Sequence, residues 1–406
     1  MLVGVSPRLL LALALLAAPA HAQFLNRAVW LGDDEPFRRD YAQDAEYFVD
    51  RWGIVDAPPW WSPGAPFADR LAVAVGSVSS SQLTVEAAVD LGLDLGSGVR
   101  ARVDVLQSEH QTTRFQRIGF GLEAGLGDGA AAFAQVEGTA DKSRADLSLG
   151  VQLGSGPGSA HRLSLTLVDF AAAKSDSFDY VQRPYGLLAA GYVGASEGPR
   201  LAYELGLQLP FEEQDAAAGT QLELWRAIGH LEASAPLSAR DRLTIGLGGE
   251  RTSKSLAPFA GGTVAAEDGE VELGRVSAEW WRRGAAGREY ALGAWFLALD
   301  EDYVPTADPA AAQDTRRREA MLTARARLPL SGPWSVEPYA VGGRVDLERV
   351  DPALPGGAQR DLGFQGRCGV PLRWDLSGFA WMRIDLSMQL DQLAFGGAAL
   401  QLVANL

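Results

Sequence analysis

The stretch Leu83-Thr-Val-Glu-Ala-Ala-Val-Asp-Leu-Gly-Leu-Asp-Leu95 decides the fold class. Every odd position in it is apolar, and the even positions carry Thr84, Glu86, Ala88, Asp90, Gly92 and Asp94. Because successive side chains of a strand point to opposite faces, this strand has one apolar and one polar face. The same two-residue period recurs in 144–153, 319–328 and 376–390. The pattern predicts an all-β protein.

Segments of this kind follow one another from residue 71 to residue 406. We predict about eighteen strands, or sixteen if one hairpin is miscounted, over 71–78, 82–95, 98–109, 112–126, 129–140, 143–155, 159–170, 185–195, 199–209, 220–235, 241–252, 269–283, 286–300, 316–330, 333–347, 359–373, 375–390 and 393–406. Repeated amphipathic segments of about ten residues are typical of a transmembrane antiparallel up-and-down β-barrel. A soluble β-sandwich or β-helix, which also alternates, is the competing interpretation.

The lengths of the connections favour the barrel. Outer-membrane barrels have short periplasmic turns and longer outer loops. If the connections between strands are numbered along the chain, the tight ones all have even numbers. They are 96–97, 127–129, 196–198, 284–287, 331–333 and 374–375. The long connections all have odd numbers and are 171–184, 210–219, 253–268, 301–315 and 348–358. A sandwich gives no reason for this segregation. With the first strand running outward, both the N and C termini are predicted to be periplasmic.

The first 22 residues have the pattern of a cleavable secretory signal. Arg8 precedes an apolar run, and Ala20-His21-Ala22 provides a small-x-small cleavage site. The chain beyond it contains no stretch of eighteen apolar residues. A membrane-embedded form therefore has to be a closed barrel, because an open sheet leaves backbone groups unpaired in lipid. Residues 71–406 are the predicted barrel, in contact with outer-membrane lipid and lipopolysaccharide.

Residues 23–70 differ in composition from the remainder of the chain. Aromatic residues stand among acids and prolines there, with Phe37, Tyr41, Phe48 and Trp52 at helical spacing. We expect one short amphipathic helix over 35–52 and an irregular Pro-rich linker after it. The apolar face of that helix has to pack against another part of the protein. The segment is periplasmic and packed under the barrel rim, or inserted as a plug, or disordered.

The C-terminal residues Ala398, Leu400, Leu402, Ala404 and Leu406 alternate up to the chain end. This strand resembles the closing strand that barrel-assembly machinery reads in bacterial outer-membrane β-barrel (porin-like) proteins. The resemblance covers the signal, the alternation and the terminal strand, and it names no narrower family. Such proteins usually end in an aromatic residue, whereas this chain ends in Leu406. The resemblance implies the bacterial outer membrane as location and the assembly machinery as partner.

Charge and motifs exclude several other classes. Cleaving off Arg8 would take the net charge from −15 to −16, which argues against a nucleic-acid partner. The lone Cys368 rules out an intrachain disulfide and any cysteine-based metal site. The predicted mature chain has three histidines, His110, His161 and His230, and no metalloprotease, serine-hydrolase or phosphate-loop motif. We predict a non-enzyme without catalytic residues, cofactor or metal, and the oligomeric state stays open.

The polar face supplies the candidate site. The side chains assigned to the lumen are Arg100, Arg102, Asp104, Arg117, Glu123, Arg144, Asp146, Glu289, Glu319, Arg325, Arg327, Arg383 and Asp385. Charges of both signs suit a hydrated pore, in which charged rings set ion preference. The alternative is that they pair across strands as cross-links in a blocked barrel. Near the predicted short turns, an aromatic girdle is expected from Trp280, Trp281, Trp334 and Trp374.

Three functions fit these features. The first is a passive or weakly selective outer-membrane channel for small hydrophilic solutes, since about sixteen or more strands enclose an interior too wide for side chains alone to fill. The second is a polysaccharide secretion barrel, for which residues 23–70 would dock periplasmic partners or the emerging chain. The third is a closed surface receptor or structural barrel.

Overall fold

The protein is described here from a computed structural model. The structure describes residues 70–77, 83–109, 114–139, 145–156, 158–168, 170, 178–194, 198–305, 310, 312–350, 358–378, 380–391 and 393–405. The predicted signal peptide over 1–22 and the predicted helix and linker over 23–69 lie outside these residues.

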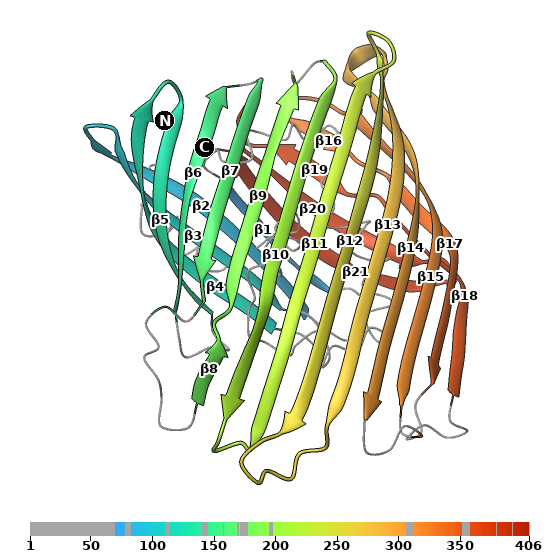
Figure 1. The fold of residues 1–406 in the computed structure, drawn as a ribbon. Coiled ribbons are helices and arrows are strands. Elements are labelled where there is room, and N and C mark those ends of the chain that lie inside the picture. The colour runs from blue at the N-terminus through green and yellow to red at the C-terminus, as the bar shows by residue number, and fades with distance from the viewer. Residues whose placement is uncertain are drawn as a thin grey trace.

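The described residues form one antiparallel sheet (Figure 1). Its strands are β1 (Arg70–Ser77), β2 (Leu83–Gly96), β3 (Val99–Glu109), β4 (Arg114–Gly127), β5 (Ala130–Thr139), β6 (Ala145–Gly156), β7 (Ser159–Leu167), β8 (Phe178–Gln182), β9 (Tyr185–Gly194), β10 (Arg200–Asp215), β11 (Thr220–Pro236), β12 (Asp241–Pro258), β13 (Glu267–Arg283), β14 (Glu289–Pro305), β15 (Gln313–Pro329), β16 (Trp334–Val336), β17 (Tyr339–Val350), β18 (Ala358–Gly369), β19 (Leu372–Asp375), β20 (Ala380–Gln389) and β21 (Ala394–Asn405). A single 3-10 turn, η1 (Ala285–Gly287), joins β13 to β14.

The sheet closes on itself. Each strand pairs with the ones before and after it once the short segments β8, β16 and β19 are joined to β9, β17 and β18. In addition β1 pairs with β21, so that Val75 lies opposite Val85 on one side and Leu400 on the other. Closure satisfies the backbone groups of both edges, which an open sheet would leave unpaired. The predicted antiparallel up-and-down β-barrel is confirmed.

Prolines explain why the sheet has 21 strand segments where eighteen strands were predicted. The breaks that separate β8 from β9, β16 from β17 and β18 from β19 fall at Arg183-Pro184, Glu337-Pro338 and Val370-Pro371. Proline has no N–H to donate to the strand ladder, so the pairing is interrupted at each of these sites. When each of these three short segments is joined to its longer continuation, eighteen strands remain around the ring.

The two ends of the barrel have different connections. Tight turns such as Ser97-Gly98 and Asp128-Gly129 lie at one end, hereafter the short-turn end; their positive φ angles suit glycine. At the opposite, long-loop end, three connections are much shorter than predicted. The expected loops 210–219, 253–268 and 301–315 are at least half strand, which leaves 216–219, 259–266 and 306–312 between the strands. Phe211 and Leu224, paired and buried, hold the extended β10–β11 hairpin together.

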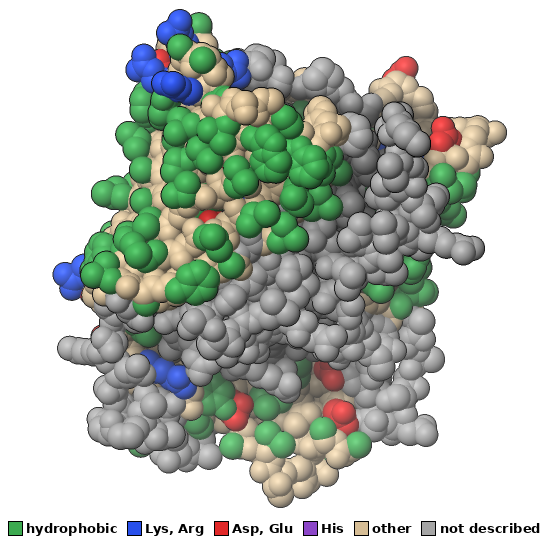
Figure 2. Space-filling view, turned by 180° about the vertical axis from the view of Figure 1, so that it is seen from behind, with side chains coloured by type: hydrophobic (Ala, Val, Ile, Leu, Met, Phe, Trp, Pro, Cys, Tyr) green, Lys and Arg blue, Asp and Glu red, His purple; other side chains and the backbone are tan. Residues whose placement is uncertain are grey.

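The exposed apolar side chains share one face of each strand. On β15 Leu322 is exposed whereas its neighbours Met321 and Thr323 are buried, and on β20 Leu386 is exposed between buried Asp385 and Ser387. Figure 2 shows such side chains gathered over the outer surface. The outer face is therefore apolar, and the polar face of the alternation points inward. In the described ranges no helix is long and apolar enough to cross a membrane.

Candidate functional site

The strand register places most of the predicted site residues on the inner face. These are Arg100, Arg102, Glu123, Asp146, Glu289, Glu319, Arg325, Arg327, Arg383 and Asp385, all opposite in face to the exposed apolar residues. Arg144 lies outside the described residues, as do the side chains of Asp104 and Arg117. A role of these residues in lining a pore stays a prediction.

Near the start of the chain, the inner face carries a pair of arginines on β3. Arg102 Nη1 lies 3.2 Å from Glu123 Oε2 on β4. Arg100 passes over Gly92 on β2, where a Cβ atom would come 1.8 Å from Arg100 Nε. Gly92 thus gives the guanidinium room to lie along the wall. Arg102 is buried and paired, whereas Arg100 is partly exposed.

A dense charge network lies on the inner face near the short-turn end, around Glu337. This carboxylate is 3% exposed and is approached by Arg327 at 3.7 Å, Arg373 at 3.5 Å and Arg383 at 3.6 Å. Asp375 joins the network by accepting from both Arg327 and Arg373 at 2.7 Å. Three guanidinium groups thus converge on one buried carboxylate. We refer to these five residues as the Glu337 network.

Local backbone geometry explains why Glu337 occupies this position. It lies in the break between β16 and β17, next to Pro338, and its N–H donates to Pro371 O at 2.8 Å. Pro371 belongs to the matching break between β18 and β19. The two proline interruptions therefore lie side by side in neighbouring strands, and the hydrogen-bond pattern between these strands is irregular there. Sequence reasoning missed Glu337, although the two Xaa-Pro interruptions at 337–338 and 370–371 were a usable signal.

Further along β15 the inward charges are also paired. Arg325 forms an ion pair with Glu279 of β13, and Arg317 with Glu319. Glu319 also accepts from the indole Nε1 of Trp295 on β14 at 3.1 Å. Arg317 and Glu319 have no exposed surface, which makes them a buried ion pair. Pairing is what allows charges to be buried at all.

Next to these charges the inner face is apolar, which the two-residue alternation had not predicted. One cluster combines side chains of β13, β14, β15 and β17, namely Val271, Leu273, Trp295, Leu297, Leu299, Met321, Val341 and Val345. We call it the inner apolar patch. Its signal in the sequence was the run Ala291-Leu-Gly-Ala-Trp-Phe-Leu-Ala-Leu299, apolar on both faces. Such a run is typical of a strand that is buried on both faces.

Tryptophans near the short turns are distributed over both faces. Trp334 and Trp374 are paired across β16 and β19 and stack with ring centroids 5.3 Å apart. Trp280 lies opposite exposed Leu292, whereas Trp281 lies opposite Ala291, which is buried. Adjacent strand residues alternate, so Trp280 and Trp281 cannot share a girdle. The expected outer position of Trp281 was therefore wrong.

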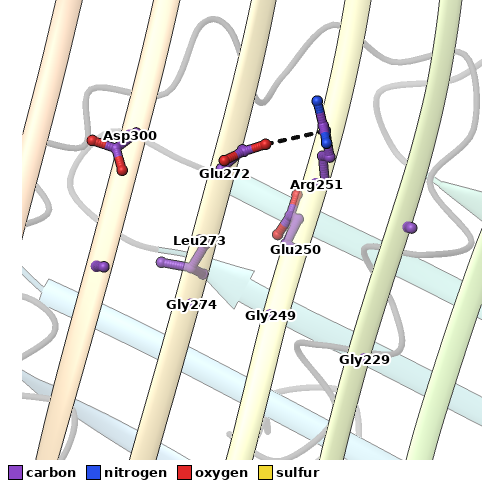
Figure 3. Close-up of a pocket in the computed structure, with 10 residues that line it drawn as sticks. Gly229, Gly249, Glu250, Arg251, Glu272, Leu273, Gly274 and Asp300 are labelled. Atoms are coloured by element: carbon purple, nitrogen blue, oxygen red, sulfur yellow. Dashed lines mark ion pairs between the residues drawn. The ribbon is translucent and has the colours of Figure 1, made fainter.

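On the outer face the apolar band ends toward the long-loop end in a row of charges. Arg251 pairs with Glu270 at 3.3 Å and with Glu272 at 3.2 Å, and Arg318 binds Asp300 at 2.7 Å. Below this row, Gly229, Gly249, Gly274 and Ala298 lie side by side in register across β11 to β14. Their small size leaves a shallow depression of about 570 Å³ (Figure 3).

The structure offers no arrangement for metal chemistry within its described part. No group of three or more His, Cys, Asp and Glu side chains there is placed to hold a metal ion. His161 is hydrogen-bonded through Nδ1 to Tyr203 Oη at 2.9 Å, and their rings stack. Both lie on the face of the exposed residues Leu163 and Leu205, in line with an aromatic pair on the outside of the wall.

A closed antiparallel ring with an apolar outside and charges inside has the architecture of the bacterial outer-membrane β-barrel class. No protein-family model matches this sequence, and neither does any curated protein. Among solved structures, it is similar to the loop L8 deletion form of OmpT, an outer membrane protein of Vibrio cholerae, with 10% identity, 83% of this chain and 96% of that chain covered, and a TM-score of 0.40. A bacterial polysaccharide outer membrane secretin has 10% identity, 84% and 99% coverage and a TM-score of 0.38. OccK10 (OpdN) of Pseudomonas aeruginosa has 12% identity, 84% and 98% coverage and a TM-score of 0.37. These likenesses concern the fold alone.

Proposed function

We propose that this protein is an outer-membrane channel through which small hydrophilic solutes pass along a lumen of mixed charge. The observation that carries the proposal is the closed ring of 21 strand segments whose inward side chains include arginines and carboxylates of many strands. A ring of this size is wider than wall side chains can fill, so an interior of water, plug or solute is required.

Orientation follows from the same proposal. The short-turn end would be periplasmic and the long-loop end would face outward, as is usual for outer-membrane barrels. Arg70, which begins β1, and Asn405, which ends β21, are paired toward the short-turn end. Both ends of the described barrel would then be on the periplasmic side.

The test of the proposal is single-channel conductance of the refolded mature protein in a planar bilayer under a salt gradient. We expect discrete conductance steps and a reversal potential that reports ion preference. The absence of steps in bilayers that contain correctly folded protein would contradict the channel function, and would favour polysaccharide export or a closed receptor.

The variant Arg100→Glu should change ion preference in these recordings. Arg100 is the partly exposed member of the β3 arginine pair, and its replacement exchanges a positive for a negative charge on the inner face. We expect the reversal potential to shift toward cation preference, because lumen charges set selectivity.

The matched control is Arg344→Glu, which makes the same exchange on the outer face, where Arg344 is paired with Asp346 at 2.8 Å. The control should leave the reversal potential unchanged. Equal shifts in both variants would mean that the measured preference does not arise in the lumen.

A further inference from the structure

The inner apolar patch is buried although it belongs to a single-layered wall. Val271, Leu299 and Val345 have no exposed surface, and Met321 is 1% exposed. On the same strands, the outward-facing Leu322 is 69% exposed. The two faces of one wall therefore differ in whether something packs against them.

Wall side chains alone do not account for this burial. The patch extends over four neighbouring strands, and its members project toward a lumen that is too wide for side chains of the opposite wall to fill. Leaving such a patch in water would cost about 25 cal/mol for each Å² of apolar surface. A cover from inside the barrel is therefore needed, and all described strands are already used in the wall.

We propose that residues 23–69 of the same chain dock on the inner apolar patch from within the lumen. The segment precedes β1, which begins at Arg70, and β1 lies four strand steps from β17 by way of β21, β20 and β18. Across the strands this is roughly 20 Å at a spacing of about 4.8 Å. The strand pairing also sets Val345 about fourteen residues nearer the long-loop end than Arg70, roughly 45 Å along the strands. An extended chain covers about 3.3 Å per residue, so about fifteen residues of the segment are enough to reach the patch.

The composition of the segment matches the patch. It contains ten aromatic residues, namely Phe24, Trp30, Phe37, Tyr41, Tyr47, Phe48, Trp52, Trp60, Trp61 and Phe67. Aromatic rings bury large apolar areas and pack well against aliphatic side chains such as those of Leu297 and Leu299. Docking would thus bury two apolar surfaces at once, one on the segment and one on the wall. It would also narrow the lumen on the side of β13 to β17, which goes beyond the proposed channel function.

Thiol accessibility in the full mature chain tests this docking. In a Cys368→Ser background, Val345→Cys reports on the patch and Ala239→Cys, in an exposed turn, serves as the reference. Refolded protein is treated with a hydrophilic maleimide. We expect the thiol at 345 to react about tenfold or more slowly than the thiol at 239. Leu299→Cys provides a second reporter should the first variant fold poorly.

The identity of the cover is tested by disulfide trapping. Val345→Cys is combined, one at a time, with Ala28→Cys, Gly53→Cys and Ser62→Cys, which leave the aromatic residues intact. At least one pair should form a disulfide, and Trp60→Ser with Trp61→Ser should raise the labelling rate at position 345. Rapid labelling at 345 in the unaltered segment overturns the docking. So does slow labelling without any disulfide and without an effect of the tryptophan changes. Neither readout depends on conductance, so the channel function can fail while the docking stands.

Discussion

Replacing Leu386 with arginine is expected to destabilise the barrel by about 2–4 kcal/mol, since that is the cost of an arginine on the lipid face near the bilayer midplane. Leu386 is 62% exposed on the outer face of β20, and its neighbours Ile384 and Met388 on that face are also exposed and apolar. A guanidinium in this row would have to leave water for lipid. The measurement is the free energy of unfolding in urea of protein refolded into lipid vesicles.

The same substitution at another depth is the matched control. Leu376 lies in the turn between β19 and β20, and an arginine near the membrane interface costs only about 0–1 kcal/mol. Arg383→Ala, on the inner face of the same strand, should still insert and should alter conductance, although it lowers stability by removing a guanidinium from buried Glu337 and Asp385. Similar losses of stability for Leu386→Arg and Leu376→Arg would show that the outer face was assigned incorrectly.

Glu337→Ala should have the larger effect, with a loss of about 3–5 kcal/mol, because removing one partner of a buried ion pair leaves uncompensated charge behind. Here Arg327, Arg373 and Arg383 all lie within 3.7 Å of the removed carboxylate. Asp375 still faces Arg327 and Arg373, and Asp385 still faces Arg383 at 3.8 Å, so the three guanidinium groups are left with these two carboxylates. Urea unfolding in vesicles again gives the measurement, and Glu337→Gln separates loss of charge from loss of volume.

An exposed ion pair provides the comparison for the Glu337 network. Arg344 and Asp346 are 2.8 Å apart on the outer face and are 75% and 53% exposed in their side chains. Exposed pairs contribute about 0–1 kcal/mol, so Asp346→Asn should change the free energy of unfolding little. A loss after Glu337→Gln no larger than the loss after Asp346→Asn would mean that water reaches the network and screens it.

Much of the wall was predictable from the sequence because alternation is a local property. The segments predicted over 82–95, 98–109 and 185–195 differ by at most one residue at either end from β2, β3 and β9. The inner position of Arg383 and the outer position of Leu386 follow from the same period. Turn placement was also predictable, since tight turns need residues such as Gly98 that tolerate a positive φ.

The remainder depends on contacts between distant strands. Glu337 meets several arginines only because strand pairing brings Arg373 of β19 and Arg383 of β20 close to it. No local sequence pattern specifies this pairing. The inner apolar patch was missed because Leu297 and Leu299 were interpreted by alternation, although their strand is apolar on both faces. Trp280 and Trp281 lie on opposite faces of the wall although both are near a turn. Predicting an aromatic girdle therefore requires the face of each residue as well as its distance from a turn.

The seam between β1 and β21 also governs how the barrel can be made. Val75 and Leu400 are partners in this seam, so the contact joins the first and the last strand of the barrel. Until the last strand has been synthesised and delivered, the first strand has no partner on that side and exposes a row of unpaired amide and carbonyl groups. Such an edge recruits other chains into aggregates. We therefore expect a newly made molecule to need a protein that shields its edges, and loss of the twelve residues of β21 would leave the barrel open.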